Sequence, residues 1–126
     1  MFTKSSEKLE SLVGAQADFK GELHVKGTLR VDGKINGLIH ADCVVLGETA
    51  SIYGDITARK IIVGGKVEGN IRALELVEIK SKGKVLGEIL APRFSVVDGG
   101  EFNGKIDMKR EPSKVLPLEG LADSAG

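Results

Sequence analysis

A short apolar phrase with a central glycine recurs along this chain at intervals of fifteen to eighteen residues. In each copy, apolar residues stand two positions before and two positions after the glycine, with residues of mixed and mostly polar character between them. Apolar residues at every second position indicate a β-strand with one buried face. A near-constant period in a short chain predicts stacked repeats. The central glycines are Gly21, Gly37, Gly54, Gly69, Gly87 and Gly104.

Aligning the copies on their glycines produces three apolar columns, which we expect to point into one shared core. They stand two residues before the glycine, two after it and four after it. The third column is mostly alanine, which indicates a narrow corner of the interior. The columns are Phe19, Ile35, Ile52, Val67, Val85 and Phe102; Leu23, Ile39, Ile56, Ile71, Ile89 and Ile106; and Val25, Ala41, Ala58, Ala73, Ala91 and Met108.

Each period also holds a second apolar run, such as Val44–Leu46 or Ile61–Val63, and in most periods a glycine follows soon after it. The pattern therefore predicts two or three short strands per period, joined by tight turns. An antiparallel meander is one arrangement of such strands, with Asp32-Gly33 and Asp98-Gly99 as hairpin turns. A parallel β-solenoid is favoured, because only parallel stacking keeps equivalent residues in register from coil to coil.

The predicted fold is all-β, a right-handed parallel β-helix of about six coils with short disordered tails. The irregular period favours the right-handed form, since left-handed solenoids use strict hexapeptide repeats. We expect residues 12–108 to form the β-helix domain. Residues 1–11 form an N-terminal tail, and residues 109–126 form a disordered C-terminal tail that contains two prolines.

Composition narrows the classes of function. The 18 Lys and Arg residues balance 18 Asp and Glu residues, which argues against nucleic acid as a partner. Cys43 is the single cysteine, so we expect no disulfide framework and a cytoplasmic setting. No apolar run is long enough to span a membrane, and the N-terminus lacks the apolar stretch of a secretory signal.

Catalytic chemistry is poorly represented. His24 and His40 share a column one coil apart, but no third metal ligand follows them in that column. The segment from Gly27 to Lys34 departs from a phosphate-binding loop in its spacing and in having Ile35 where Ser or Thr is required. We therefore expect no catalytic, cofactor-binding or metal site. Leu86 and Leu90 face outward on one strand and form a candidate lateral or partner patch.

The ends of a solenoid expose unpaired backbone groups and an apolar cross-section. Three of the four phenylalanines fall in the terminal periods, and none falls between them. Bulky rings at these places plug the narrow core and also form a surface on which another copy can dock. The expected polymer contacts are therefore Phe19, Phe94 and Phe102.

These repeats resemble those of the bactofilins, bacterial polymer-forming cytoskeletal proteins. The similarity covers about Leu12 to Met108 and includes Leu29–Gly37 and Gly99–Gly104. The resemblance implies a right-handed β-helix that forms non-polar filaments end to end without nucleotide. It also implies a scaffold for cell shape or the cell envelope, working with peptidoglycan-modifying enzymes, and it places a C-terminal polymer contact at Phe102.

The first residues resemble the membrane-targeting peptide found in many bactofilins. Met1, Phe2 and Lys4 are the candidate anchor residues, which implies a peripheral position at the inner face of the cell membrane. Two other interpretations stay open. One is a left-handed solenoid of the acyltransferase type, and the other is a monomeric solenoid that binds a protein or carbohydrate with its flank.

Overall fold

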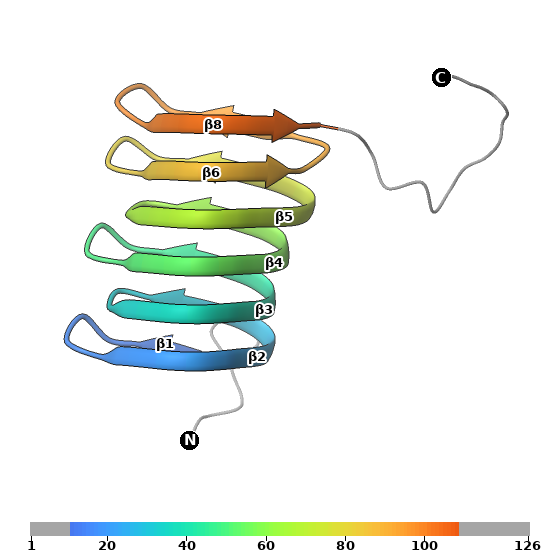
Figure 1. Ribbon diagram of the computed structural model, residues 1–126. Coiled ribbons are helices and arrows are strands. Elements are labelled where there is room, and N and C mark those ends of the chain that lie inside the picture. Colours follow the sequence, from blue (N-terminus) through green and yellow to red (C-terminus); the bar gives the residue numbers. More distant parts are fainter. Residues whose placement is uncertain (1–10, 109–126) are drawn as a thin grey trace, which may run out of the picture.

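The chain winds into a right-handed β-solenoid. The computed structural model describes residues 11–108 and contains no helix within that range. In Figure 1 the near strands run from left to right, and the chain returns behind them as it climbs, which is the right-handed sense. The strands are β1 (Ser11–Val13), β2 (Asp18–Val31), β3 (Lys34–Leu46), β4 (Ser51–Val63), β5 (Lys66–Ile79), β6 (Lys84–Leu90), β7 (Phe94–Val96) and β8 (Glu101–Asp107).

All strand pairs of the described chain are parallel, so the antiparallel meander is excluded. The register places each repeat glycine directly against the glycine of the next coil. The right-handed parallel β-helix predicted from the sequence is thereby confirmed. Six glycine-bearing strands give five complete turns between the first and the last, slightly fewer than the six coils expected.

The two apolar runs of each inner period form one strand, which corrects the expected two or three. Strands β2 to β5 are 13 or 14 residues long and bend around a corner of the solenoid. The part before the bend, which contains the glycine, is here called the glycine face. The part after it, represented by Val44–Leu46 in β3, is called the second face.

The irregular period has two local causes. The turn between successive coils has either two residues, as at Gly64–Gly65, or four, as at Gly47–Ala50. In addition, the pairing shifts at the bend between Val25 and Thr28, and again after Ala58. The buried strands keep their register because the turns and the bend absorb every change of length.

The core is a stack of identical layers. Ile35 and Ile52 before the glycine, and Ile39 and Ile56 after it, are completely buried. The alanine column is also buried between Ala41 and Ala91, which agrees with the narrow corner expected there. No polar or charged residue among residues 13–108 is fully buried, so the interior of the inner coils consists of apolar side chains.

The recurring glycine has a backbone reason. All six repeat glycines have positive φ, between 128° for Gly21 and 149° for Gly37. L-residues with a side chain rarely adopt this conformation. From the second coil onward, a Cβ atom at the glycine would also overlap the carbonyl oxygen of the preceding repeat glycine. We call these six residues the glycine ladder.

Candidate assembly surfaces

The C-terminal end exposes the last layer of the core. Phe94 on β7 and Phe102 on β8 pack edge to face, with ring centroids 5.8 Å apart. Both rings are only partly buried. Val96 is 42% exposed, although the equivalent Val63 and Ile79 in inner coils are completely buried. This end therefore presents a continuous apolar surface built by two strands.

Met108 corrects one expectation. Its column points inward in the inner coils, but Met108 itself is 49% exposed. Strand β8 ends at Asp107, and no further coil follows within the described residues to cover the side chain. Met108 therefore extends the apolar surface at this end.

The N-terminal end exposes the first layer in the same way. Phe19, Leu23 and Val25 on β2 and Val13 on β1 pack against the core but are only partly buried. Strand β1 pairs with Leu29–Val31 alone. The first half of β2, from Asp18 to Val25, therefore has one unpaired backbone edge among residues 11–108.

The three phenylalanines expected at polymer contacts all lie in terminal layers. The structure brings Phe94 and Phe102 together at the C-terminal end and places Phe19 at the opposite end. Unpaired strand edges bordered by apolar side chains are templates for pairing with another chain. Within residues 11–108, each end of the solenoid carries such an edge.

The flank holds a second kind of surface. Leu86 on β6 is 50% exposed and points outward as expected, whereas Leu90 is half-buried. Tyr53, another outward residue, lies between the Lys34 and Lys66 ammonium groups, each within 6 Å of its ring centroid. Sequence reasoning missed Leu74, which is 52% exposed at the bend of β5. The alternation of apolar residues did not identify it, because the alternation breaks at the bend.

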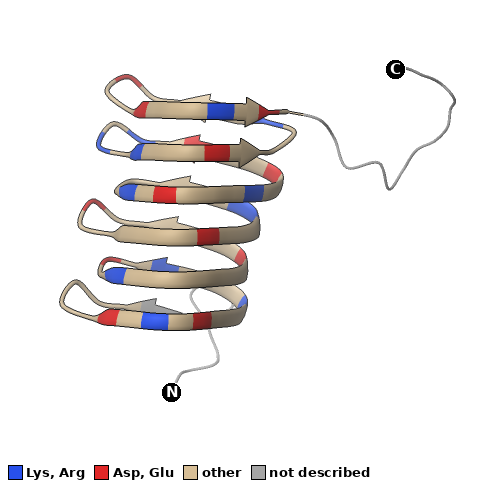
Figure 2. Cartoon of the chain, viewed as in Figure 1, with Lys and Arg blue, Asp and Glu red and all other residues tan. Residues whose placement is uncertain are grey.

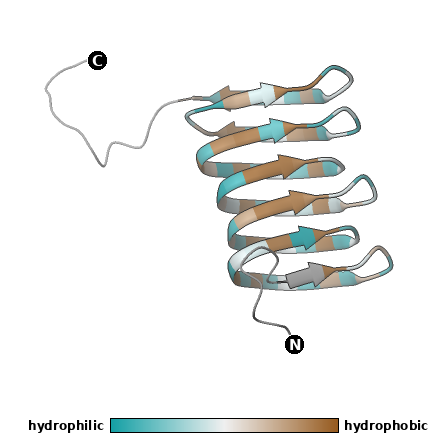
Figure 3. Ribbon diagram, turned by 180° about the vertical axis from the view of Figure 1, so that it is seen from behind, coloured by the Kyte–Doolittle hydropathy of each residue, from teal (hydrophilic) through white to brown (hydrophobic). Residues whose placement is uncertain are grey.

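The second face carries outward apolar residues that also escaped the sequence analysis. Val45 and Ile62 occupy matching positions on β3 and β4 and are half-buried. Figure 3 shows hydrophobic colouring along several coils of this face. Val45 and Ile62 line a shallow groove. The groove lies between the four-residue turns Gly47–Ala50 and Lys80–Gly83, where the intervening turn Gly64–Gly65 is shorter.

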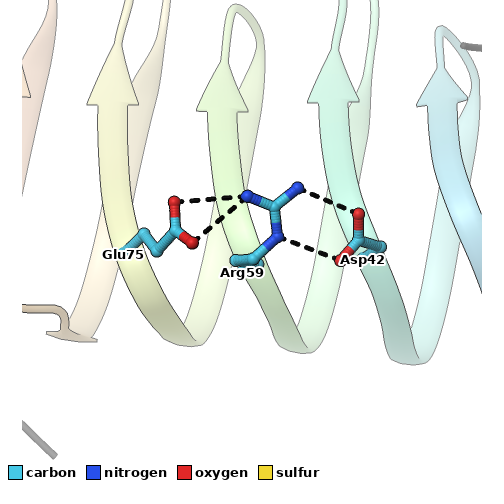
Figure 4. A network of polar contacts seen from close by, with 3 residues as sticks. All are labelled: Asp42, Arg59 and Glu75. Atoms are coloured by element: carbon cyan, nitrogen blue, oxygen red, sulfur yellow. Dashed lines mark hydrogen bonds and ion pairs between the residues drawn. The ribbon is translucent and has the colours of Figure 1, made fainter.

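An ion-pair network ties three coils together at the bend. Arg59 donates to both carboxylate oxygens of Asp42 at 3.0 and 3.1 Å and to those of Glu75 at 3.2 Å (Figure 4). The hydrogen bonds that Arg59 donates lower the pKa of Asp42. The same bonds, first those to Asp42 and then those to Glu75, raise the pKa of Arg59. The charges alternate along the axis, so each pair of neighbouring coils gains one attractive contact.

Other charged groups are spread over the outside. Figure 2 shows Lys and Arg interleaved with Asp and Glu across the coils. His24 and His40 lie side by side on neighbouring coils as expected, with ring centroids 5.6 Å apart and ring planes tilted by 45°. His24 also lies 3.3 Å from Glu22. Among residues 11–108, His, Cys, Asp and Glu side chains form no group of three suited to a metal ion. The described residues also include no helix long and apolar enough to cross a membrane.

Parallel coils with a partly exposed core layer at each end define a β-solenoid. Over residues 11–107 the sequence matches the family model described as bactofilin, polymer-forming cytoskeletal. The chain belongs to the bactofilin family, and the resemblance seen in its repeats is confirmed.

Two curated relatives come from Myxococcus xanthus. Bactofilin BacP is 33% identical over 116 residues, which are 91% of this chain and 48% of BacP. Bactofilin BacO is 30% identical over 99 residues, which are 78% of this chain and 79% of BacO. The chain thus spans about half the length of BacP and most of the length of BacO.

A solved structure has the same fold. It is a cryo-electron-microscopy reconstruction of Thermus thermophilus bactofilin double helical filaments. The TM-score is 0.70 at 23% sequence identity, and the match covers 76% of this chain and 96% of the other. The likeness establishes a shared solenoid architecture.

Proposed function

We propose that this chain is a cytoskeletal scaffold whose subunits join end to end into filaments. The observation on which the proposal rests is the contrast within each core column. Ile39 and Ile56 are completely buried in inner coils, whereas Leu23 and Ile106 in the terminal coils are only partly buried. Docking of another coil on each end would remove this apolar surface from water, which favours association.

The C-terminal contact is assigned to Phe94 and Phe102, with Phe19 as the aromatic residue of the N-terminal contact. A charge at Phe102 would have to be buried without a partner in the joint, which is strongly unfavourable. Phe102→Arg should therefore leave a folded solenoid that no longer forms filaments. The measurement is negative-stain electron microscopy together with sedimentation.

Asn103→Arg is the matched control. Asn103 is exposed and stands next to Phe102 on the same strand, so it receives the same new charge on the outer face. Filaments of Asn103→Arg should have the same length as those of the wild type; their pairing is not part of this comparison, because Asn103 lies opposite Leu86. Filaments of normal length from Phe102→Arg would contradict the assignment of Phe102 to the C-terminal contact. The absence of filaments from the wild-type protein would contradict the proposed function itself.

Assembly needs no nucleotide under this proposal, because the driving force is apolar burial and strand pairing between subunits. Filaments should therefore form in buffer without nucleotide, and added ATP or GTP should not change the critical concentration. The filament would serve as a scaffold for cell-shape or envelope machinery, including peptidoglycan-modifying enzymes.

Membrane attachment is assigned to Met1, Phe2 and Lys4, which lie outside the described residues. Burial of one Phe side chain contributes roughly 1.5–3 kcal/mol, and a basic residue near anionic lipid contributes about 1 kcal/mol. One copy would bind weakly, and a filament that displays many copies would bind by avidity. Co-sedimentation with anionic liposomes should fall for Phe2→Ser, while filament formation continues. Equal pelleting of both proteins would contradict the anchor.

Lateral association is assigned to the outward leucines of β6. The Thermus thermophilus relative was imaged as double helical filaments. A double filament requires a lateral contact between two rows of subunits. Leu86 is half exposed and Leu90 lies four residues further on the same strand. Leu86→Lys should yield single filaments of normal length in negative-stain images, whereas paired filaments would contradict this role.

A second candidate function is a monomeric binding module. The groove over Val45 and Ile62, with Arg30, Asp32 and Lys82 at its rim, is the feature that favours it. Size-exclusion chromatography separates the two functions. A 13.3 kDa monomer at all concentrations favours the binding module, and material in the void volume favours the filament.

A further inference from the structure

The groove on the second face has an apolar floor and two charged walls. Val45 and Ile62 point outward from neighbouring strands and form the floor. Glu48 belongs to the turn that forms one wall, and Lys80 and Lys82 belong to the turn that forms the other. An apolar floor between walls of opposite charge fits a peptide segment that is apolar in its middle and carries a charge of each sign at its ends.

The chain itself contains such a segment after the solenoid. Residues 109–126 lie outside the described residues and include the segment Lys114–Glu119, in which four apolar residues stand between a lysine and a glutamate. Pro117 has no backbone N–H and disfavours a helix, so we expect this segment to bind in an extended form. Leu116 and Leu118 would then lie on the same side of it.

The segment is long enough to reach the groove. Met108 stands in the same column as Ala58, three coils further along the axis, which is a separation of about 14 Å. Ile62 lies four residues beyond Ala58 on the same strand, about 13 Å away. Met108 and Ile62 are therefore separated by about 20 Å in a direct line. The seven residue steps from Met108 to Val115 span up to about 23 Å when extended.

We propose that the groove is the docking site of the chain's own Lys114–Glu119 segment, whose two leucines cover the apolar floor. The lysine at its start pairs with the wall that carries Glu48, and the glutamate at its end pairs with the wall that carries Lys80 and Lys82. Apolar burial makes the larger contribution, since exposed ion pairs contribute little. The docking does not depend on filament assembly. A partner of the binding module described above would have to displace the segment.

A single tryptophan reports where the segment lies, because the chain contains none. Leu116→Trp in the full chain keeps an apolar side chain at the centre of the segment. Its fluorescence emission should lie at shorter wavelength than that of tryptophan in water, and acrylamide should quench it only weakly. Emission at the wavelength of a water-exposed indole would overturn the proposal without any change to the solenoid.

A charge in the floor should release the segment. Ile62→Lys, combined with Leu116→Trp, should shift the emission to that of a water-exposed indole, and Val45→Lys should act in the same way. Leu86→Lys is the matched control, since it replaces an outward apolar residue by lysine on the glycine face, away from the groove. It should leave the emission at shorter wavelength.

Circular dichroism of each lysine variant checks that the solenoid is folded. Emission that stays at shorter wavelength in both folded floor variants would show that the segment binds elsewhere, for example on the apolar surface at the C-terminal end. That result would overturn the proposal.

Dilution separates docking within one copy from docking between copies. Emission of Leu116→Trp should be independent of protein concentration, down to concentrations at which sedimentation finds single subunits only. A shift to longer wavelength on dilution would show that the segment binds the groove of a second copy, and it would overturn docking within the chain. Filament formation is measured separately, so failure of the wild type to assemble would leave this result unchanged.

Discussion

At the scale of single residues, the glycine ladder is the feature least tolerant of change. Gly54 has a φ of 144°, and a Cβ there would overlap the carbonyl oxygen of Gly37. Both neighbouring coils hold this backbone in place, so it cannot move away from the clash. Glycine at this position is therefore required by geometry, even though the residue is only partly buried.

Gly54→Ala is predicted to lower the free energy of unfolding by about 2–6 kcal/mol, the sum of backbone strain and overpacking. Urea denaturation followed by circular dichroism measures the loss. Gly14→Ala, which introduces neither effect, is the control. Equal stability of the two variants would mean that the ladder glycines are not under steric constraint.

The Arg59 network makes a prediction about pH. The folded pKa of Asp42 is lowered by Arg59, so the pair stabilises the fold at pH values above the unfolded pKa of Asp, about 3.9. This stabilisation is lost as the pH falls through the lowered folded pKa. Arg59→Gln should reduce the melting temperature at pH 7, and the difference from wild type should shrink below about pH 4. The effect should be small, because the side chain of Arg59 is 40% exposed and solvent screens the charges.

Lys82→Gln is the control for the network, since it removes one positive charge from an exposed turn. Its melting temperature should follow that of the wild type at both pH values. A difference for Arg59→Gln that is equally large at pH 3 and pH 7 would show that the ion pairs are not its cause.

At the scale of elements, the position of a strand in the stack decides how much its side chains contribute. Ile56 and Ile106 occupy the same column, but Ile56 is completely buried and Ile106 only partly. Ile56→Ala should cost about 2–5 kcal/mol of unfolding free energy. Ile106→Ala should cost clearly less in dilute subunits, as measured by urea denaturation. Similar costs would contradict a half-open terminal layer.

The elements also show how far the sequence alone could lead. The three apolar columns and the parallel register followed from the alternation around each glycine, because the period of two is a property of any half-buried strand. The bend did not follow, since pairing shifts between Val25 and Thr28 and again after Ala58. The Asp42–Arg59–Glu75 network lies at that bend, so it was missed. Its alternating charges at intervals of 17 and 16 residues were the available indication.

The sequence predicted that the phenylalanines expected at polymer contacts lie in the terminal layers. It did not predict that two of them contact each other. Phe94 and Phe102 lie eight residues apart in sequence, on different faces of the solenoid, and meet only because the chain turns between β7 and β8. Leu86 followed the alternation, whereas Leu74 stands at the bend, where the alternation no longer tells inside from outside.

At the scale of the whole molecule, stability should depend on protein concentration. Association of folded subunits stabilises the native state by mass action, by up to about 1.4 kcal/mol for each tenfold rise in concentration. The wild-type melting temperature should therefore rise with concentration, as followed by circular dichroism. That of Phe102→Arg should rise less or stay constant. A wild-type melting temperature that is independent of concentration would contradict assembly.

The identical inner layers have one more consequence. Each of β3, β4 and β5 pairs only with the coils next to it, and none of them reaches both ends. Duplicating one such period would lengthen the rod by about 4.8 Å while leaving its first and last coils untouched. Subunit length and subunit joining can thus diverge independently during evolution, so that related chains could build fibres of different axial repeat from one shared type of joint.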